Sequence, residues 1–259
     1  ISDFKYTGVS VGWVWGYTPS PSKRNRVEYN HIHHLGWGVL SDMGGVYTLG
    51  ASQGTTVSNN IIHHIYSLDY GGWGLYTDEG SEGITMENNL VYNCKSSGFH
   101  QHYGKENIIR NNIFVNNIKA QLQATRVEKH RSFSFTNNIV YFSSGTLLSS
   151  NWTTADITTD ENCYWDTRSN NILFGKKTFA AWQQEGKDKH SVIADPGFKD
   201  VKNFDFRITN KRIISKIKFK PFDYSKEGVY GTAEWIQKAQ FDAVRAEAFD
   251  QMVAEHEKE

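Results

Sequence analysis

A short phrase, an asparagine followed by two mostly apolar residues, occurs six times in the first two thirds of the chain. Successive asparagines are roughly 23 to 30 residues apart, an interval typical of solenoid repeats. Each asparagine follows a short run in which apolar and polar residues alternate, as in a strand with one buried face. Short strands repeated at such a period predict a β-solenoid. The asparagines are Asn30, Asn60, Asn89, Asn112, Asn138 and Asn162.

Stacked coils would place these asparagines above one another at one corner. Asparagine tolerates the left-handed or bridging backbone of a tight corner, and amides in successive coils can hydrogen-bond along the stack. The alternative is a β-sandwich with asparagine turns, but its strands recur every ~8–12 residues without a longer period. We therefore predict an all-β fold, a parallel β-helix over residues 1–165.

The repeat fades after Asp166, and residues 166–230 are expected to form an irregular C-terminal cap. Within it, a short helix is predicted from Phe179 and a last strand over Phe204–Ile208. A C-terminal α-helix is predicted over residues 231–259, with Thr232 as its N-cap. Apolar residues recur there at helical spacing: Phe241, Val244, Ala248, Met252 and Val253.

Composition excludes several classes of function. The chain has 28 basic and 28 acidic residues and no basic stripe, so no nucleic-acid partner is expected. No apolar run is long enough to cross a membrane. Cys94 and Cys163 are predicted to be buried and free. Because the chain starts in the middle of a repeat, upstream β-helix coils are expected in a longer protein. We also expect a periplasmic or extracellular location.

Five histidines suggest a metal cluster at first sight. They are His31, His33, His34, His63 and His64. However, His33 matches His63 and His34 matches His64 at the same interval that separates Asn30 from Asn60. A stacked ladder beside the asparagine corner explains them, and we predict no metal and no cofactor.

Three related phrases indicate a functional site. Gly36–Gly44 and Gly72–Gly80 both read Gly-Trp-Gly-apolar-x-[Ser/Thr]-Asp-x-Gly, 36 residues apart, and Gly98–Gly104 is a third version with histidine in place of aspartate. In a parallel stack, equivalent residues lie ~4.8 Å apart. Stacking these phrases in register predicts two polar columns: Asp42, Asp78 and His102, and beside it Ser41, Thr77 and Gln101.

Two carboxylates about 5 Å apart repel each other, so at least one pKa should be raised. One protonated and one ionised carboxyl group is the arrangement that glycosidases use, and we predict Asp42 and Asp78 as the catalytic pair. A structural alternative exists for the aspartates, because Asp in Asp-x-Gly also forms ordinary turns. Some of the tryptophans could likewise serve only to anchor the core or a loop. The residues expected to bind substrate are Trp13, Trp15, Trp37, Trp73, Glu79, His100, Gln101 and His102.

Longer phrases resemble glycoside hydrolase family 141, a family of bacterial enzymes. The phrases are Tyr6–Trp13, Arg24–His33, Leu40–Tyr47, Asp69–Gly80 and Gly98–Gly104. The resemblance covers about residues 1–230 and implies a right-handed parallel β-helix. It also implies hydrolysis of a plant cell-wall glycan, with α-L-fucosidase or xylanase activity and two catalytic aspartates that fall on Asp42 and Asp78. Members of that family are much longer than this chain.

Two other functions stay open from the residues alone. A polysaccharide lyase on the same scaffold would need a Lys, Arg or His base and usually Ca²⁺ or Arg to neutralise a uronate. The predicted columns contain little Lys or Arg, which counts against a lyase. A non-catalytic glycan-binding module would bind the same sugars without turnover.

Overall fold

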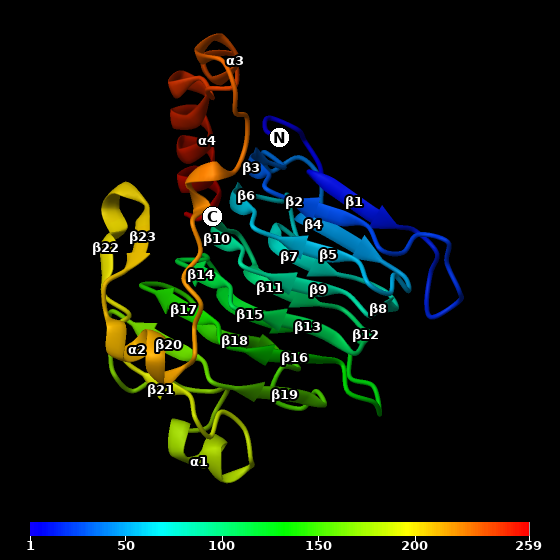
Figure 1. The fold of residues 1–259 in the computed structure, drawn as a ribbon, viewed down its shortest axis with the longest axis vertical. Coiled ribbons are helices and arrows are strands. Elements are labelled where there is room, and N and C mark those ends of the chain that lie inside the picture. Colours follow the sequence, from blue (N-terminus) through cyan, green and yellow to red (C-terminus); the bar gives the residue numbers. More distant parts are fainter. Residues whose placement is uncertain (259) are drawn as a thin grey trace.

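Three parallel sheets form the sides of a solenoid in the computed structural model, which describes residues 1–258 (Figure 1). The first sheet contains β1 (Val9–Gly12), β4 (Gly44–Leu49), β7 (Trp73–Thr77), β11 (Ser97–Gln101), β15 (Ala120–Ala124) and β18 (Thr146–Ser150). The second contains β2 (Arg26–Glu28), β5 (Thr56–Ser58), β9 (Thr85–Glu87), β13 (Asn107–Arg110), β16 (Phe133–Thr136) and β19 (Ile157–Asp160). The third contains β3 (His31–Leu35), β6 (Ile61–Ile65), β10 (Leu90–Cys94), β14 (Ile113–Val115), β17 (Ile139–Phe142), β20 (Cys163–Asp166) and β21 (Val192–Ile193).

Each coil contributes one strand to each sheet, so about six coils stack along the axis. Two short strands, β8 (Ser81–Glu82) and β12 (Gly104–Lys105), pair at the corner after the first sheet. Inside the solenoid, apolar side chains from successive coils lie above one another and exclude water. One such column is Val46, Leu75, Phe99, Leu122 and Leu148. The predicted parallel β-helix is confirmed.

The asparagine ladder is also confirmed. The Asn60 amide donates to Asn89 Oδ1 at 2.9 Å, and the Asn89 amide donates to Asn112 Oδ1 at 2.9 Å. The contacts continue from Asn112 to Asn138 at 3.1 Å. The residue before each ladder asparagine is left-handed, with φ between 53 and 57°. The left-handed residue thus makes the corner, and the next one places its amide in the stack. The corner residues are Tyr29, Asn59, Asn88, Asn111, Asn137 and Glu161.

At its far end the ladder meets a buried carboxylate. Asp188 is 1 % exposed. Its Oδ1 accepts a hydrogen bond from the Asn162 amide at 3.0 Å and another from the Tyr164 hydroxyl at 3.1 Å. The Trp182 indole donates to its other oxygen at 2.7 Å. These donors replace the water that a buried charge loses.

The region after residue 165 is a mixture of short elements. β21 extends the third sheet by pairing with β20, so regular stacking continues past Asp166. The predicted short helix is confirmed as α1 (Phe179–Gln184), and β23 (Asp205–Ile208) matches the predicted last strand. β23 pairs antiparallel with β22 (Phe198–Asp200). The remaining elements are α2 (Lys211–Lys216) and two 3₁₀ turns, at Val201–Asn203 and Tyr224–Lys226.

The C-terminal helical stretch is divided in two. α3 (Ala233–Lys238) begins after Thr232, whose hydroxyl accepts from the Trp235 N–H as an N-cap. α4 (Ala243–His256) has its own cap, because the Asp242 carboxylate accepts from the Arg245 N–H. Figure 1 places α4 beside β3, at the end of the solenoid where the chain begins. The last position of the predicted helix, residue 259, lies outside the described residues.

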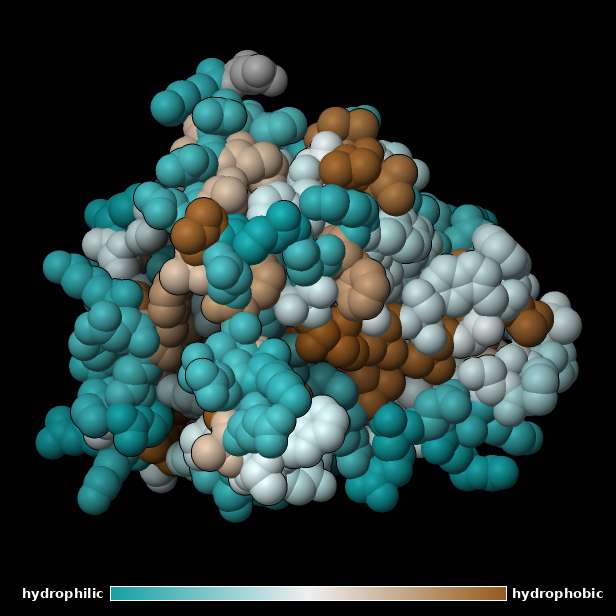
Figure 2. Space-filling model, turned by 90° about the horizontal axis from the view of Figure 1, so that it is seen from above, coloured by the Kyte–Doolittle hydropathy of each residue, from teal (hydrophilic) through white to brown (hydrophobic). Residues whose placement is uncertain are grey.

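That end of the solenoid is partly apolar. Figure 2 looks down on it and shows hydrophobic residues gathered near the middle of the face. Ile1 and Phe4 are 44 % and 57 % exposed. The upstream coils expected from the sequence stay a prediction.

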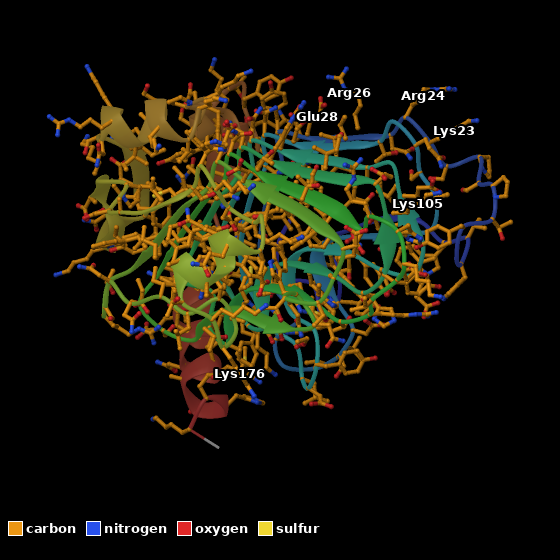
Figure 3. The ribbon with its side chains drawn as sticks, turned by 90° about the horizontal axis from the view of Figure 1, so that it is seen from below. Lys23, Arg24, Arg26, Glu28, Lys105 and Lys176 are labelled. Carbon is orange, nitrogen blue, oxygen red and sulfur yellow. The ribbon has the colours of Figure 1, made fainter. Side chains whose placement is uncertain are left out.

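The outer edge of the second sheet is basic in places. Figure 3 shows Lys23, Arg24 and Arg26 along one edge of the molecule, with Lys105 nearby. Arg26 is paired with Glu28 at 2.6 Å, which neutralises part of this charge. Within the described part of the chain, no helix has the length and apolar character needed to cross a membrane.

Candidate active site on the first sheet

An open cavity of about 380 Å³ lies beside the first sheet. Strands β7, β11 and β15 supply part of its lining, the segments next to these strands supply most of the rest, and Asp42 comes from the segment before β4. Six of the residues predicted for the site line it: Asp42, Trp73, Asp78, Glu79, His100 and His102. Four residues that were not predicted complete the lining: Tyr70, Tyr76, Gln123 and Thr125.

The first of the three related phrases, Gly36–Gly44, does not stack in register on the second. β4 pairs with β7 so that Thr48, and not Ser41, lies beside Thr77. Asp42 therefore does not lie in one column with Asp78, and this prediction is wrong. The number of residues along the chain from a β4 residue to its β7 partner equals the number from Asn60 to Asn89 in the ladder. The longer offset between the two similar phrases does not fit that coil.

The second and third phrases, Gly72–Gly80 and Gly98–Gly104, are stacked as predicted. Gln101 lies beside Thr77, and the His102 N–H donates to the Thr77 carbonyl at 2.8 Å. Asp78 and His102 therefore occupy equivalent positions in neighbouring coils.

The two aspartates nevertheless meet, from opposite ends of the first sheet's strands. Asp42 precedes β4 and Asp78 follows β7. The Tyr47 hydroxyl lies 3.3 Å from Asp42 Oδ2 and 2.6 Å from Asp78 Oδ2. One hydroxyl thus reaches both carboxylates within hydrogen-bonding distance, so these two oxygens cannot be further apart than the two contacts together. The Tyr76 hydroxyl donates to the other Asp42 oxygen at 3.0 Å.

Asp42 is held by its backbone in an uncommon conformation. Its φ is 54°, in the left-handed region that aspartate tolerates better than most residues. Its N–H donates to the Tyr70 carbonyl at 2.9 Å, and its carbonyl accepts from the Tyr6 hydroxyl at 2.8 Å. Gly71 packs against this backbone, where a Cβ would lie 2.9 Å from Asp42 N. Left-handed residues fixed in this way are enriched at functional sites.

Several neighbouring groups affect the pKa of Asp42. Burial raises the pKa of Asp42, hydrogen bonds from Tyr76 and Tyr47 oppose this rise, and the charge of Asp78 adds to it. Tyr47 has one proton and can donate it to only one carboxylate at a time. A proton on Asp42 would let both contacts of Tyr47 be hydrogen bonds, since Asp42 would donate to Tyr47 and Tyr47 to Asp78.

Aromatic rings form one wall of the cavity. The rings of Trp73 and Tyr76 lie 4.3 Å apart, and those of Trp73 and His100 lie 4.0 Å apart. The Trp73 indole donates to Gln123 Oε1 at 2.6 Å, which fixes its plane. Burial lowers the pKa of His100 well below its ordinary value, so that ring is neutral. A rigid wall of this kind can pack against the apolar face of a ligand.

The far side of the cavity is polar. His102 Nδ1 lies 2.9 Å from the Thr125 hydroxyl, and His102 Nε2 lies 3.9 Å from a Glu79 carboxylate oxygen. These side chains can donate and accept hydrogen bonds, as the recognition of a polar ligand requires.

The other predicted site residues lie outside this cavity. Gln101 is buried and accepts a hydrogen bond from Asn107 at 3.0 Å, so it braces the corner. Trp37 packs against Phe249 of α4, with ring centroids 5.0 Å apart. Trp13 contacts Tyr47 at 4.9 Å, and Trp15 is 58 % exposed.

The predicted histidine ladder is confirmed on the third sheet. His33 and His63 stack at 5.0 Å with an 8° angle between ring planes, and His34 and His64 stack at 4.8 Å with a 4° angle. Burial is the main cause that lowers the pKa of His31 and His34 to about 4 and that of His64 to about 3. All three rings are therefore neutral near pH 7.

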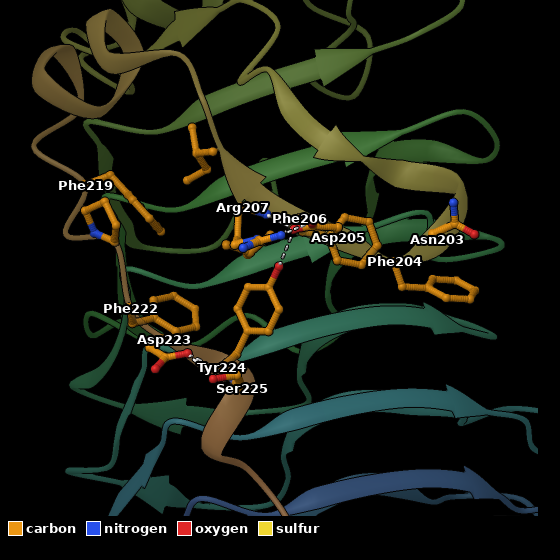
Figure 4. Close-up of a pocket in the computed structure, with 13 residues that line it drawn as sticks. Asn203, Phe204, Asp205, Phe206, Arg207, Phe219, Phe222, Asp223, Tyr224 and Ser225 are labelled. Atoms are coloured by element: carbon orange, nitrogen blue, oxygen red, sulfur yellow. Dashed lines mark hydrogen bonds and ion pairs between the residues drawn. The ribbon is translucent and has the colours of Figure 1, made fainter.

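A second cavity, of about 670 Å³, lies in the cap (Figure 4). Aromatic residues of the cap line much of it: Phe204, Phe206, Phe219, Phe222 and Tyr224. A hydrogen bond from Arg207 is the main cause that lowers the pKa of Asp205, the carboxylate at its wall. The other carboxyl group in its lining is Asp223, whose pKa is lowered mainly by a hydrogen bond from Ser225, so neither carboxyl group of this cavity has a raised pKa.

The comparisons with known proteins define the class of this chain. Residues 7–163 match the family described as "Right handed beta helix region". The match covers more than half of the chain, so the protein belongs to the right-handed β-helix family. This fold is consistent with carbohydrate-active enzymes and with binding modules. The chain matches no curated protein and no solved structure at a significant level.

Proposed function

We propose that this protein is a glycoside hydrolase that cleaves a plant glycan in the cavity on the first sheet. The observation that carries the proposal is the Tyr47 hydroxyl, which lies within 3.3 Å of both Asp42 and Asp78. Two carboxyl groups with different surroundings, beside an aromatic wall, form the acid and base pair of a glycosidase.

We propose a role for each carboxyl group from its surroundings. Asp42, whose pKa is raised mainly by burial, is the better candidate to donate a proton to the leaving glycosidic oxygen. Asp78 accepts the Tyr47 hydrogen bond at 2.6 Å and is assigned the role of nucleophile. Trp73, which is only 4 % exposed, would contact a sugar over the small part of its surface that lines the cavity, and Glu79 and His102 would bind hydroxyl groups.

The separation of the pair predicts the stereochemistry. The two oxygens that Tyr47 joins are at most about 6 Å apart, which is closer to the ~5–5.5 Å of retaining enzymes than to the ~6.5–9.5 Å of inverting ones. We therefore infer a covalent glycosyl intermediate on Asp78. Proton NMR shows which product anomer forms first and so measures the stereochemistry of hydrolysis. A first product with inverted configuration would contradict the inference.

The test of activity uses paired variants on fucosylated and xylan substrates. Asp42→Asn and Asp78→Asn should each lower kcat/KM by at least about 10²-fold, as removal of a general acid or base does. Asp156→Asn is the matched control, because Asp156 is exposed and lies outside the cavity. Hydrolysis that survives in both variants would refute the dyad. Binding without turnover in the unmodified protein would indicate a glycan-binding module instead.

The specific activity, α-L-fucosidase or xylanase, follows only from the resemblance to family 141. A lyase would release an unsaturated product that absorbs in the ultraviolet. The residues that line the cavity include no Lys or Arg to neutralise a uronate, so hydrolysis is the better proposal.

A further inference from the structure

Five imidazoles are packed together on the third sheet, which is a different sheet from that of the cavity. Three of them, His31, His33 and His63, each place a ring nitrogen within 4.8 Å of the other two. Phe241 covers His34 and His33, with ring centroids 4.4 and 5.2 Å away. The cluster is thus enclosed on one side.

His31 is not explained by the stacked ladder. The ladder pairs His33 with His63, but β3 and β6 are in register with His31 beside Ile61. The next two coils have Leu90 and Ile113 at that position. The column is otherwise apolar, and His31 alone introduces an imidazole, which turns toward His63.

Each of the three rings brings one nitrogen close to the other two. His31 Nε2 lies 2.7 Å from His63 Nε2. His33 contacts His34 through Nδ1, so its Nε2 remains for a ligand. Imidazoles bound to zinc at ~2.0–2.1 Å hold their nitrogens about 3.3 Å apart in a tetrahedral site. A small outward movement of one ring would open the His31–His63 pair to this geometry.

In two of the three ligands, the other ring nitrogen already has the partner that a metal-bound histidine needs. His33 Nδ1 lies 2.7 Å from His34 Nδ1, and His63 Nδ1 is hydrogen-bonded to His64 Nδ1. Such outer hydrogen bonds fix the ring orientation and the tautomer of a metal ligand. His33 and His63 are buried and His31 is only half-buried, so water can reach the cluster from the side of His31.

We propose that the Nε2 atoms of His31, His33 and His63 bind one divalent ion of the kind that prefers imidazole, with Zn²⁺ as the reference. His34 and His64 orient two of the three ligands, and a water molecule occupies the fourth position. The site joins two coils of the third sheet beside Phe241 and α4. It is independent of the proposed hydrolysis.

The first test is direct binding to the unmodified chain without an affinity tag. After treatment with chelator, calorimetric titration with Zn²⁺ should show one ion per chain. X-ray absorption of the zinc complex should show three imidazole nitrogens at ~2.0–2.1 Å. Sub-stoichiometric binding, or a first shell without three imidazoles, would overturn the proposal even if every variant misfolded.

The second test uses His31→Ile, which restores the apolar residue found in the neighbouring coils and should preserve the fold. Loss of an outer hydrogen-bond partner weakens metal affinity by ~10–100-fold, and the loss of Zn²⁺ affinity in His34→Gln should fall within that range. The loss of Zn²⁺ affinity in His31→Ile should be larger, because a ligand itself is removed. His190→Gln is the control, since His190 is exposed and pairs with Asp160. Circular dichroism checks that each variant is folded. Equal Zn²⁺ affinity in His31→Ile and His190→Gln would refute the site.

Discussion

The asparagine ladder provides the sharpest test of what holds this solenoid together, through the variant Asn112→Ala. Asn112 is fully buried in the middle of the ladder. Its Oδ1 accepts from the Asn89 N–H and the Asn89 amide, both at 2.9 Å. Its amide donates to the Met86 and Arg110 carbonyls at 3.0 Å and to Asn138 at 3.1 Å. Alanine removes all of these contacts.

The expected loss follows from the groups left behind. The Asn89 N–H and the Asn89 side-chain amide both lose the acceptor that Asn112 Oδ1 gives them in the interior, and each such buried donor costs about 1–3 kcal/mol. The free energy of unfolding should therefore fall by about 2–6 kcal/mol. Asn30→Ala is the matched control. Asn30 is half-buried at the end of the ladder, and its amide donates only to Asn60 and the Glu28 carbonyl. Its loss should cost about 0.5–1.5 kcal/mol.

The assay is urea unfolding at equilibrium, followed by far-ultraviolet circular dichroism. The midpoint should shift much more for Asn112→Ala than for Asn30→Ala, with equal slopes if both unfold as one unit. Repeat proteins can lose this cooperativity, so the slopes are compared before free energies are. Equal destabilisation by the two variants would refute the claim that the buried ladder stabilises the fold more than an exposed corner does.

Three further predictions concern the cavity. Tyr47→Phe should lower kcat with little change in KM, because the shared hydroxyl touches both Asp42 and Asp78; an unchanged kcat would contradict this. The acid must be protonated, so activity should fall as pH rises through the pKa of Asp42, which burial raises. In the variant Asp78→Asn the repulsion from Asp78 is absent, so an NMR titration should show a lower pKa for Asp42 than in the unmodified protein. Lys95 donates to three carbonyls of the segment before Tyr70, at 2.8, 2.9 and 3.0 Å. Lys95→Met should therefore speed amide hydrogen exchange in residues 67–71, and unchanged exchange there would contradict it.

The sequence predicted the features that repeat with the coil. The ladder asparagines and the pairs His33–His63 and His34–His64 all recur at the coil length, so stacking alone puts them in contact. The matched phrases around Asp42 and Asp78 do not recur at that length. Their longer offset gave the wrong register, although both carboxylates reach the same cavity through Tyr47.

A better signal was present for the residues that were missed. Applying the Asn60–Asn89 and Asn89–Asn112 intervals to the first sheet brings Tyr47, Tyr76 and His100 close to one column, as observed. Helical spacing was a weaker guide at the C-terminus. Val244 is 74 % exposed, whereas Phe249, which was not singled out, is 1 % exposed. The direction that α4 faces depends on its packing against the third sheet, which the spacing alone does not specify.

The ladder also has a direction. Every amide in it presents its oxygen toward the first coil and its nitrogen toward the last, so the side-chain dipoles add along the axis as backbone dipoles do in a helix. The positive end of this array falls on Asn162, and the buried Asp188 carboxylate receives it. The ladder is therefore electrically polar, and its two ends are not equivalent. A neutral residue at position 188 would leave the array without a counter-charge, so the last coil should be the first to open.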